Sequence, residues 1–86
     1  MRFELGRIVA TPGVLELVGH EGCFLLIARH AGGDWGDLDG HDRRENERAL
    51  RNGVRLLSAY DTAAGRVWII TEADRASACV LLPSEY

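Results

Sequence analysis

The sequence predicts a single α+β domain in which an antiparallel β-sheet of three to four strands is covered on one face by short helices. The apolar residues after position 53 recur with a period of two, whereas several segments before it recur with the period of a helix. A chain of 86 residues buries about 60 to 65% of its unfolded surface, which suffices for one core. We therefore expect residues 1–86 to form one domain.

A strand and a short helix are expected at the start of the chain. Residues 2–10 alternate weakly between apolar and polar side chains, which is typical of a strand. Thr11 can accept from a free helical N–H group as an N-cap, and Pro12 has a φ preset for the first helical position. These residues predict a helix over 12–18, which Gly19 ends.

The segment CFLLIARH, residues 23–30, is ambiguous. A short apolar run fits a buried helix or a buried strand equally well. We favour a second short helix that ends between Ala31 and Gly33. A strand preceded by a hairpin turn at GHEG remains the alternative.

The next helix, over residues 40–52, is marked at both ends. Asp39 is the expected N-cap, and Asp42 adds a negative charge to the first turn, where the helix dipole favours it. Gly53 fits the left-handed position that follows a last helical turn.

Three strands should follow as a C-terminal antiparallel meander. The segments VRLLSAY (54–60), RVWIIT (66–71) and SACVLL (77–82) are rich in β-branched and aromatic residues, and short turn segments separate them. The middle segment neighbours both others in sequence, so it is the expected central strand. The first strand of the chain would add a fourth at an edge.

Membrane and secreted classes are disfavoured. The longest apolar run, Cys23 to Ala28, is far shorter than the roughly 20 residues that span a bilayer. The N-terminus has no apolar signal region, so we expect a cytoplasmic protein. Cys23 and Cys79 have neither metal-site spacing nor disulfide density, which favours free buried thiols.

The stretch GDWGDLDGHDRREN, residues 33–46, has the acidic residues and glycines of a calcium loop but not its register. Aligning Gly40 with the invariant glycine of an EF-hand places Trp35 at position 1 and Asn46 at position 12. Calcium needs carboxylates at both positions, so a calcium site is not expected.

Zinc and catalytic sites are also disfavoured. A zinc site built from His30, Asp34 and His41 lacks ligand spacing on one helix. His20, His30 and His41 lie at predicted element ends, where a solvated or capping histidine is usual. Nucleophile elbows and phosphate-binding glycine loops are missing. We expect no catalytic residue, metal or cofactor, and therefore no enzyme.

Two residues are expected to hold the acidic loop, residues 33–38, in place. Asn46 lies on the core-facing side of its helix, and we expect its buried amide to bond with backbone groups of this loop. Trp35 should anchor the loop by burial. If it is exposed instead, it is the best candidate for an interaction hot spot.

Candidate partner-binding residues fall into two groups. The start of a helix does not explain Asp34, Trp35 and Asp37, so they are candidates for a protein interface. On the helix over 40–52, three exposed arginines lie within about 60° of one another and form an arginine ridge, namely Arg44, Arg48 and Arg51. Such a ridge is a solvated face, a protein-binding surface or a phosphate-binding surface.

The chain resembles a family of small uncharacterised bacterial proteins found on plasmids and other mobile elements of proteobacteria. The similarity covers nearly the whole chain and is carried by GRIVATPGVLE, by RHAGGDWGDLDGHDRRENERALRNGVRLLSAY and by VWIITEADRASACVLLPSEY. The segment VGHEGCF departs from the family pattern. The resemblance implies a context on mobile elements but supplies no activity.

Two functions follow as expectations. The first is a non-catalytic protein-interaction module of a mobile genetic element, with a possible anti-defence role, since an acidic domain of net charge −3 suits a basic partner. The alternative is an accessory protein that binds nucleic acid through the arginine ridge. The sequence leaves the oligomeric state open, a homodimer included.

Overall fold

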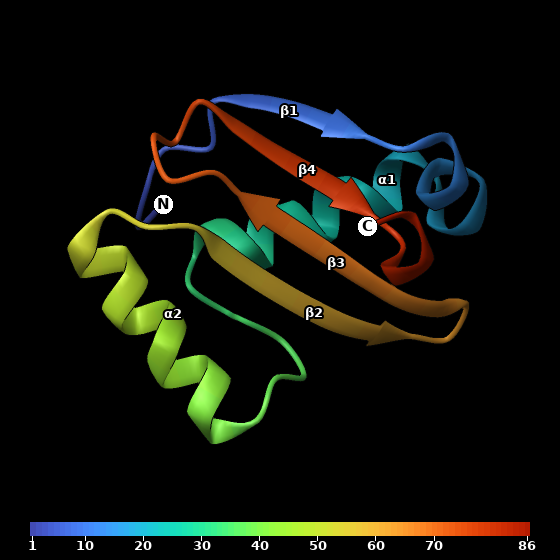
Figure 1. Cartoon of the computed structure of the whole chain (residues 1–86). Helices are drawn as coiled ribbons and strands as arrows, with labels where there is room; N and C mark the ends of the chain where they lie inside the picture. Colours follow the sequence, from blue (N-terminus) through green and yellow to red (C-terminus); the bar gives the residue numbers. More distant parts are fainter.

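Four strands form one mixed sheet in the order β1-β4-β3-β2 (Figure 1). The computed structural model describes all residues, 1–86. The strands are β1 (Arg7–Ala10), β2 (Leu56–Thr62), β3 (Gly65–Thr71) and β4 (Ser77–Leu81). The helices are α1 (Pro12–Ala31), α2 (Gly40–Asn52) and the 3-10 helix η1 (Pro83–Glu85).

The meander is confirmed, and the expectation of a purely antiparallel sheet is wrong. β3 pairs antiparallel with both β2 and β4 and is the central strand of the three. β1 occupies the edge next to β4, as a fourth strand, but it runs parallel to β4. No hairpin joins β1 to the sheet. The chain leaves β1 through α1, which lies behind the sheet in Figure 1. A connection that crosses the sheet through a helix allows the two strands that it joins to run parallel.

Both expected helices of the N-terminal half form, and together they make up α1. Thr11 caps the first helix by accepting from the backbone N–H of Val14 at 3.2 Å. Gly19 interrupts the helical backbone with φ 74° and ψ 172°, a left-handed value that glycine adopts without strain. The chain then resumes a helix through residues 23–30 and ends it at Ala31, so the helical interpretation of that segment is confirmed.

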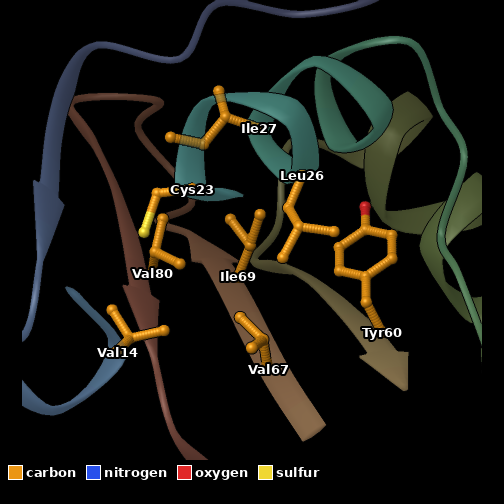
Figure 2. Close-up of a cluster of buried hydrophobic side chains, with 8 residues drawn as sticks. All are labelled: Val14, Cys23, Leu26, Ile27, Tyr60, Val67, Ile69 and Val80. Carbon is orange, nitrogen blue, oxygen red and sulfur yellow. The ribbon is translucent and has the colours of Figure 1, made fainter. Parts of the chain in front are cut away.

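The main core lies between α1 and one face of the sheet. In Figure 2, Leu26 and Ile27 of α1 lie over Val67 and Ile69 of β3. The full cluster is Val14, Cys23, Leu26, Ile27, Tyr60, Val67, Ile69 and Val80. A smaller cluster of Trp35, Ala49 and Leu56 lies between α2 and the sheet. Neither helix has the length and hydropathy needed to cross a bilayer.

His30 is fully buried, so its expected place at a solvated or capping position is wrong. Its Nδ1 lies 2.5 Å from Ser58 Oγ, and its Nε2 lies 2.8 Å from Thr71 Oγ1. His30 does lie in the last turn of α1, as expected, but its side chain faces the sheet and not the solvent. Burial, followed by the charge of Arg75, lowers the pKa of His30 to about 4.

Both cysteines are free thiols, and only one of them is buried. Cys23 belongs to the main core, whereas Cys79 is half-buried on the opposite face of the sheet. The expectation of two buried thiols is therefore correct for Cys23 and wrong for Cys79.

Candidate protein-binding surface

The two aspartates singled out in the acidic loop bind other parts of this chain. Asp34 accepts from Arg29 Nε at 2.7 Å and from the backbone N–H of Gly36 at 3.1 Å. Asp37 accepts from the backbone N–H of Asp61, at the outer edge of β2, at 2.8 Å. Their positions are thus explained by the fold of the loop.

Trp35 is buried, with 4% of its surface exposed, so it does not meet the condition for an exposed hot spot. Its indole Nε1 donates to Glu47 Oε2 at 2.8 Å, and Arg2 donates to both oxygens of the same carboxylate at 2.9 Å. The hydrogen bonds from Arg2 and then from Trp35 lower the pKa of Glu47 to about 2. This cluster fixes the N-terminus, the acidic loop and α2 to one another.

Asn46 is a buried clasp, as expected, but the segment that it binds is β2 and not the acidic loop. Its Nδ2 donates to the carbonyl of Leu57 at 2.6 Å, and its Oδ1 accepts from the N–H of Leu57 at 3.1 Å. The loop carbonyls of Gly36 and Leu38 are bound instead by Arg43, at 2.7 and 3.0 Å. Arg43 has a longer reach than asparagine and lies one turn earlier in α2.

The expected ends of α2 are confirmed. The side chain of Asp39 accepts from the backbone N–H of Asp42 at 2.8 Å. Gly53 takes the left-handed conformation with φ 67°, and its N–H donates to the carbonyl of Ala49. Asp39, Asp42 and Gly53 therefore have structural roles, as does Thr11 at the start of α1.

The arginine ridge of α2 is exposed along its length, but acidic residues are interleaved with it. Arg48 forms an ion pair with Glu45 at 2.7 Å. Arg44 and Arg51 form no ion pair in this structure. The ridge is therefore not a continuous positive surface of the kind that tracks a phosphate backbone.

The face of the sheet away from α1 carries apolar side chains that no long helix covers. It is turned toward the viewer in Figure 1, with α1 behind. The register pairs Leu57 with Ile70, Ile70 with Cys79, and Trp68 with Leu81, so all five side chains share this face. We call these five residues, with Arg55 and Tyr86 at the rim, the open sheet face.

A hollow of about 190 Å³ lies in the open sheet face, between the aromatic residues and β2. The rings of Trp68 and Tyr86 meet edge to face with centroids 5.8 Å apart. Arg55 donates to the Tyr86 hydroxyl at 2.7 Å, and 69% of Tyr86 remains exposed. A tryptophan, a tyrosine and an arginine, the residue types enriched in interaction hot spots, therefore surround one apolar hollow.

A second hollow of about 180 Å³ shares Leu57 with the first and has an acidic rim. It lies between β2 and α2 and is lined also by Leu38, Asp42, Glu45 and Asn46. Asp42 forms no ion pair within the chain. The open sheet face thus adjoins a negative edge contributed by α2.

The open sheet face was not predicted, although the sequence contains a signal for it. Residues Val67 to Ile70 are apolar at four consecutive positions, so this strand presents apolar side chains on both faces. Only one of those faces can be covered by α1. We expected each strand to alternate between apolar and polar residues, with one solvated face, and therefore did not predict the second apolar surface.

No group of three histidine, cysteine or acidic residues is arranged to hold a metal ion. No family model matches the chain, and neither a curated protein nor a solved structure matches it. The open sheet face itself is therefore the basis for the functional proposal.

Proposed function

We propose that this chain is a non-catalytic module that binds a segment of another protein on its open sheet face. The observation that supports this most is the apolar hollow framed by Trp68, Tyr86 and Arg55 on a sheet face that no long helix covers. Ile70 and Leu81 are already buried on this face, whereas Leu57 and Trp68 are partly exposed. Trp68 is only partly buried in the chain itself, and full burial of a tryptophan against a partner is among the strongest single contributions to an interface.

The charges at the rim define the chemistry of the proposed partner. Asp42 and Glu45 line the second hollow beside Leu57, and Asp42 has no cationic partner of its own. A segment that places an apolar side chain in the first hollow and a lysine or arginine toward α2 would satisfy both features. The partner is thus an apolar and basic segment, of the kind common in nucleic-acid-binding proteins.

The resemblance to proteins of mobile elements adds a biological context to this proposal. A protein carried on such an element meets the nucleic-acid-handling and defence proteins of its host, many of which are basic. We propose that the partner is one of them and that binding interferes with it by occupying a basic segment. The acidic net charge favours such an encounter.

A displayed library of random peptides, selected against the folded protein, tests the binding mode directly. We expect the enriched peptides to combine an aromatic or aliphatic residue with lysine or arginine. Trp68→Ala should weaken their binding by about tenfold or more, the effect of losing a central aromatic contact. Asp42→Asn should weaken it less, and more strongly at low salt.

The matched control is Phe24→Ala, which removes an aromatic ring that is 63% exposed on α1, behind the sheet. It should leave peptide binding unchanged. Thermal unfolding of each variant separates loss of binding from loss of folding. Selection that enriches no peptide, or peptides that bind wild type and Trp68→Ala equally well, would overturn the proposed function.

A further inference from the structure

The outer edge of β1 is unpaired. The N–H groups of Arg7 and Thr11 donate to carbonyls of the β4 side, those of Ala76 and Val80. Because backbone groups alternate along a strand, the N–H and C=O groups of Ile8 and Ala10 point away from the sheet. In Figure 1, β1 forms one border of the sheet with no segment beside it.

The opposite edge of the sheet, at β2, is closed by the chain itself. Asn46 binds both backbone groups of Leu57, and the acidic loop binds both backbone groups of Ala59. Asp37 then accepts from the N–H of Asp61. Exposed edges promote pairing between chains, and most proteins protect them. Here one edge is protected at every outward residue and the other is left free.

Apolar side chains surround the free edge. Ile8 and Val9 are 42% and 39% exposed, and Phe24 on the adjoining side of α1 is 63% exposed. A hollow of about 230 Å³ separates β1 from α1. Its lining is Ile8, Ala10, Leu15, His20, Cys23, Phe24 and Ile27, which includes no acidic or basic residue other than one histidine.

We propose that a second copy of this chain occupies this edge, with the two β1 strands antiparallel about a twofold axis. Only the register that pairs Ile8 of each copy with Ala10 of the other uses both outward residues of each strand, so we take this register. Val9 then meets Val9 of the second copy on the axis. The two sheets become one sheet of eight strands, and the two α1 helices lie side by side on the same face.

Complementarity in size and charge favours a second copy as the occupant. The register places a large residue, Ile8, against a small one, Ala10. It also places Arg7 opposite Thr11 of the second copy, and the hydroxyl of Thr11 donates to Glu85 at 2.6 Å. Arg7 forms no ion pair within its own chain, and in the dimer its guanidinium reaches this carboxylate. The pair forms twice, once on each side of the axis.

Phe24 supplies the remaining apolar contact. It lines the hollow beside Ile8 and lies on the side of α1 that faces the second copy. Pairing of the two β1 strands brings the second copy to this edge, where it covers Phe24 and the hollow next to it. This dimer uses a surface separate from the open sheet face and leaves that face free.

Sedimentation velocity over micromolar to millimolar concentrations of the purified chain tests this inference. We expect wild type to shift from monomer toward dimer as concentration rises. Ala10→Pro removes an outward N–H but no bond to β4, so the fold should tolerate it. It deletes two of the four hydrogen bonds across the axis, and dimerisation should weaken by about tenfold or more.

Charge reversal provides a second variant with a matched control. Arg7→Glu should weaken the dimer, whereas Arg44→Glu, the same change on exposed α2, should not. Trp68→Ala should also leave it intact, which keeps this test separate from that of the proposed function. Amide exchange of wild type adds a readout without mutation, since the Ile8 and Ala10 N–H groups should gain protection as concentration rises.

A wild type that stays monomeric at millimolar concentration would overturn the inference. It would be overturned in the same way if this monomer bound a foreign peptide along β1. A dimer that Ala10→Pro and Arg7→Glu both leave unchanged would overturn it equally.

Discussion

Burial of His30 makes the stability of this protein depend on pH in a defined window. The folded-state pKa of about 4 lies below the ordinary value of 6.5, because the buried imidazole is held neutral between Ser58 and Thr71. Between pH 6.5 and about pH 4, His30 is therefore protonated in the unfolded chain and neutral in the folded chain. Stability falls as pH decreases through this window and is unaffected by His30 above it.

The size of the effect follows from the shift. A difference of about 2.5 pKa units corresponds to roughly 3 kcal/mol, the most that His30 can contribute as pH falls from 7 to 4. About 2 kcal/mol of this should be lost by pH 5. That is a large share of the stability of a small domain, which is typically about 5 to 15 kcal/mol.

Urea unfolding followed by tryptophan fluorescence at pH 7.5, 6 and 5 measures this loss. His30→Gln is the matched variant, because glutamine also donates and accepts hydrogen bonds but does not titrate. It should be less stable than wild type at pH 7.5 and should lose less stability on acidification. Equal pH slopes for the two proteins, or a titration of the His30 ring near pH 6.5 by NMR, would refute the reasoning.

Three further outcomes follow from particular contacts. Asn46→Ala should cost about 2 to 3 kcal/mol in urea unfolding, because it leaves both backbone groups of Leu57 without their partner; a loss below about 0.5 kcal/mol would contradict the clasp. Gly36→Ala should destabilise the fold more than Gly53→Ala. Both glycines have positive φ, but only at Gly36 would an added Cβ meet the backbone of Ala59. Equal melting temperatures of the two variants would contradict this close contact between Gly36 and Ala59. Wild type should show no salt-dependent anisotropy change with random duplex DNA at low ionic strength, and binding that is abolished by charge reversal of the whole arginine ridge would instead support the nucleic-acid alternative.

The features that the sequence predicted correctly are those encoded within a few residues. Thr11, Asp39 and Gly53 mark helix ends through contacts with residues no more than four positions away. Their roles can therefore be predicted from the local sequence alone. The period of two after Gly53 likewise depends on neighbouring residues, and the meander follows from it.

The features that the sequence did not predict depend on contacts distant along the chain. Asn46 was recognised as a clasp, but its partner Leu57 belongs to another element, and side-chain length decided that Arg43 would bind the loop instead. His30 was expected at the surface because its partners, Ser58 and Thr71, lie 28 and 41 residues away. The open sheet face escaped prediction for the same reason, since its apolar surface is assembled from three strands.

The most direct test of the proposed function is an amide and indole NMR titration of the folded protein with a selected basic and apolar peptide. The chain contains two tryptophans, and their indole N–H groups report on different surfaces. We predict that the Trp68 indole and the amides of Leu57 and Ile70 shift, while the buried Trp35 indole, bonded to Glu47, does not. Shifts confined to the arginine ridge or to β1, with Trp68 unmoved, would contradict the account.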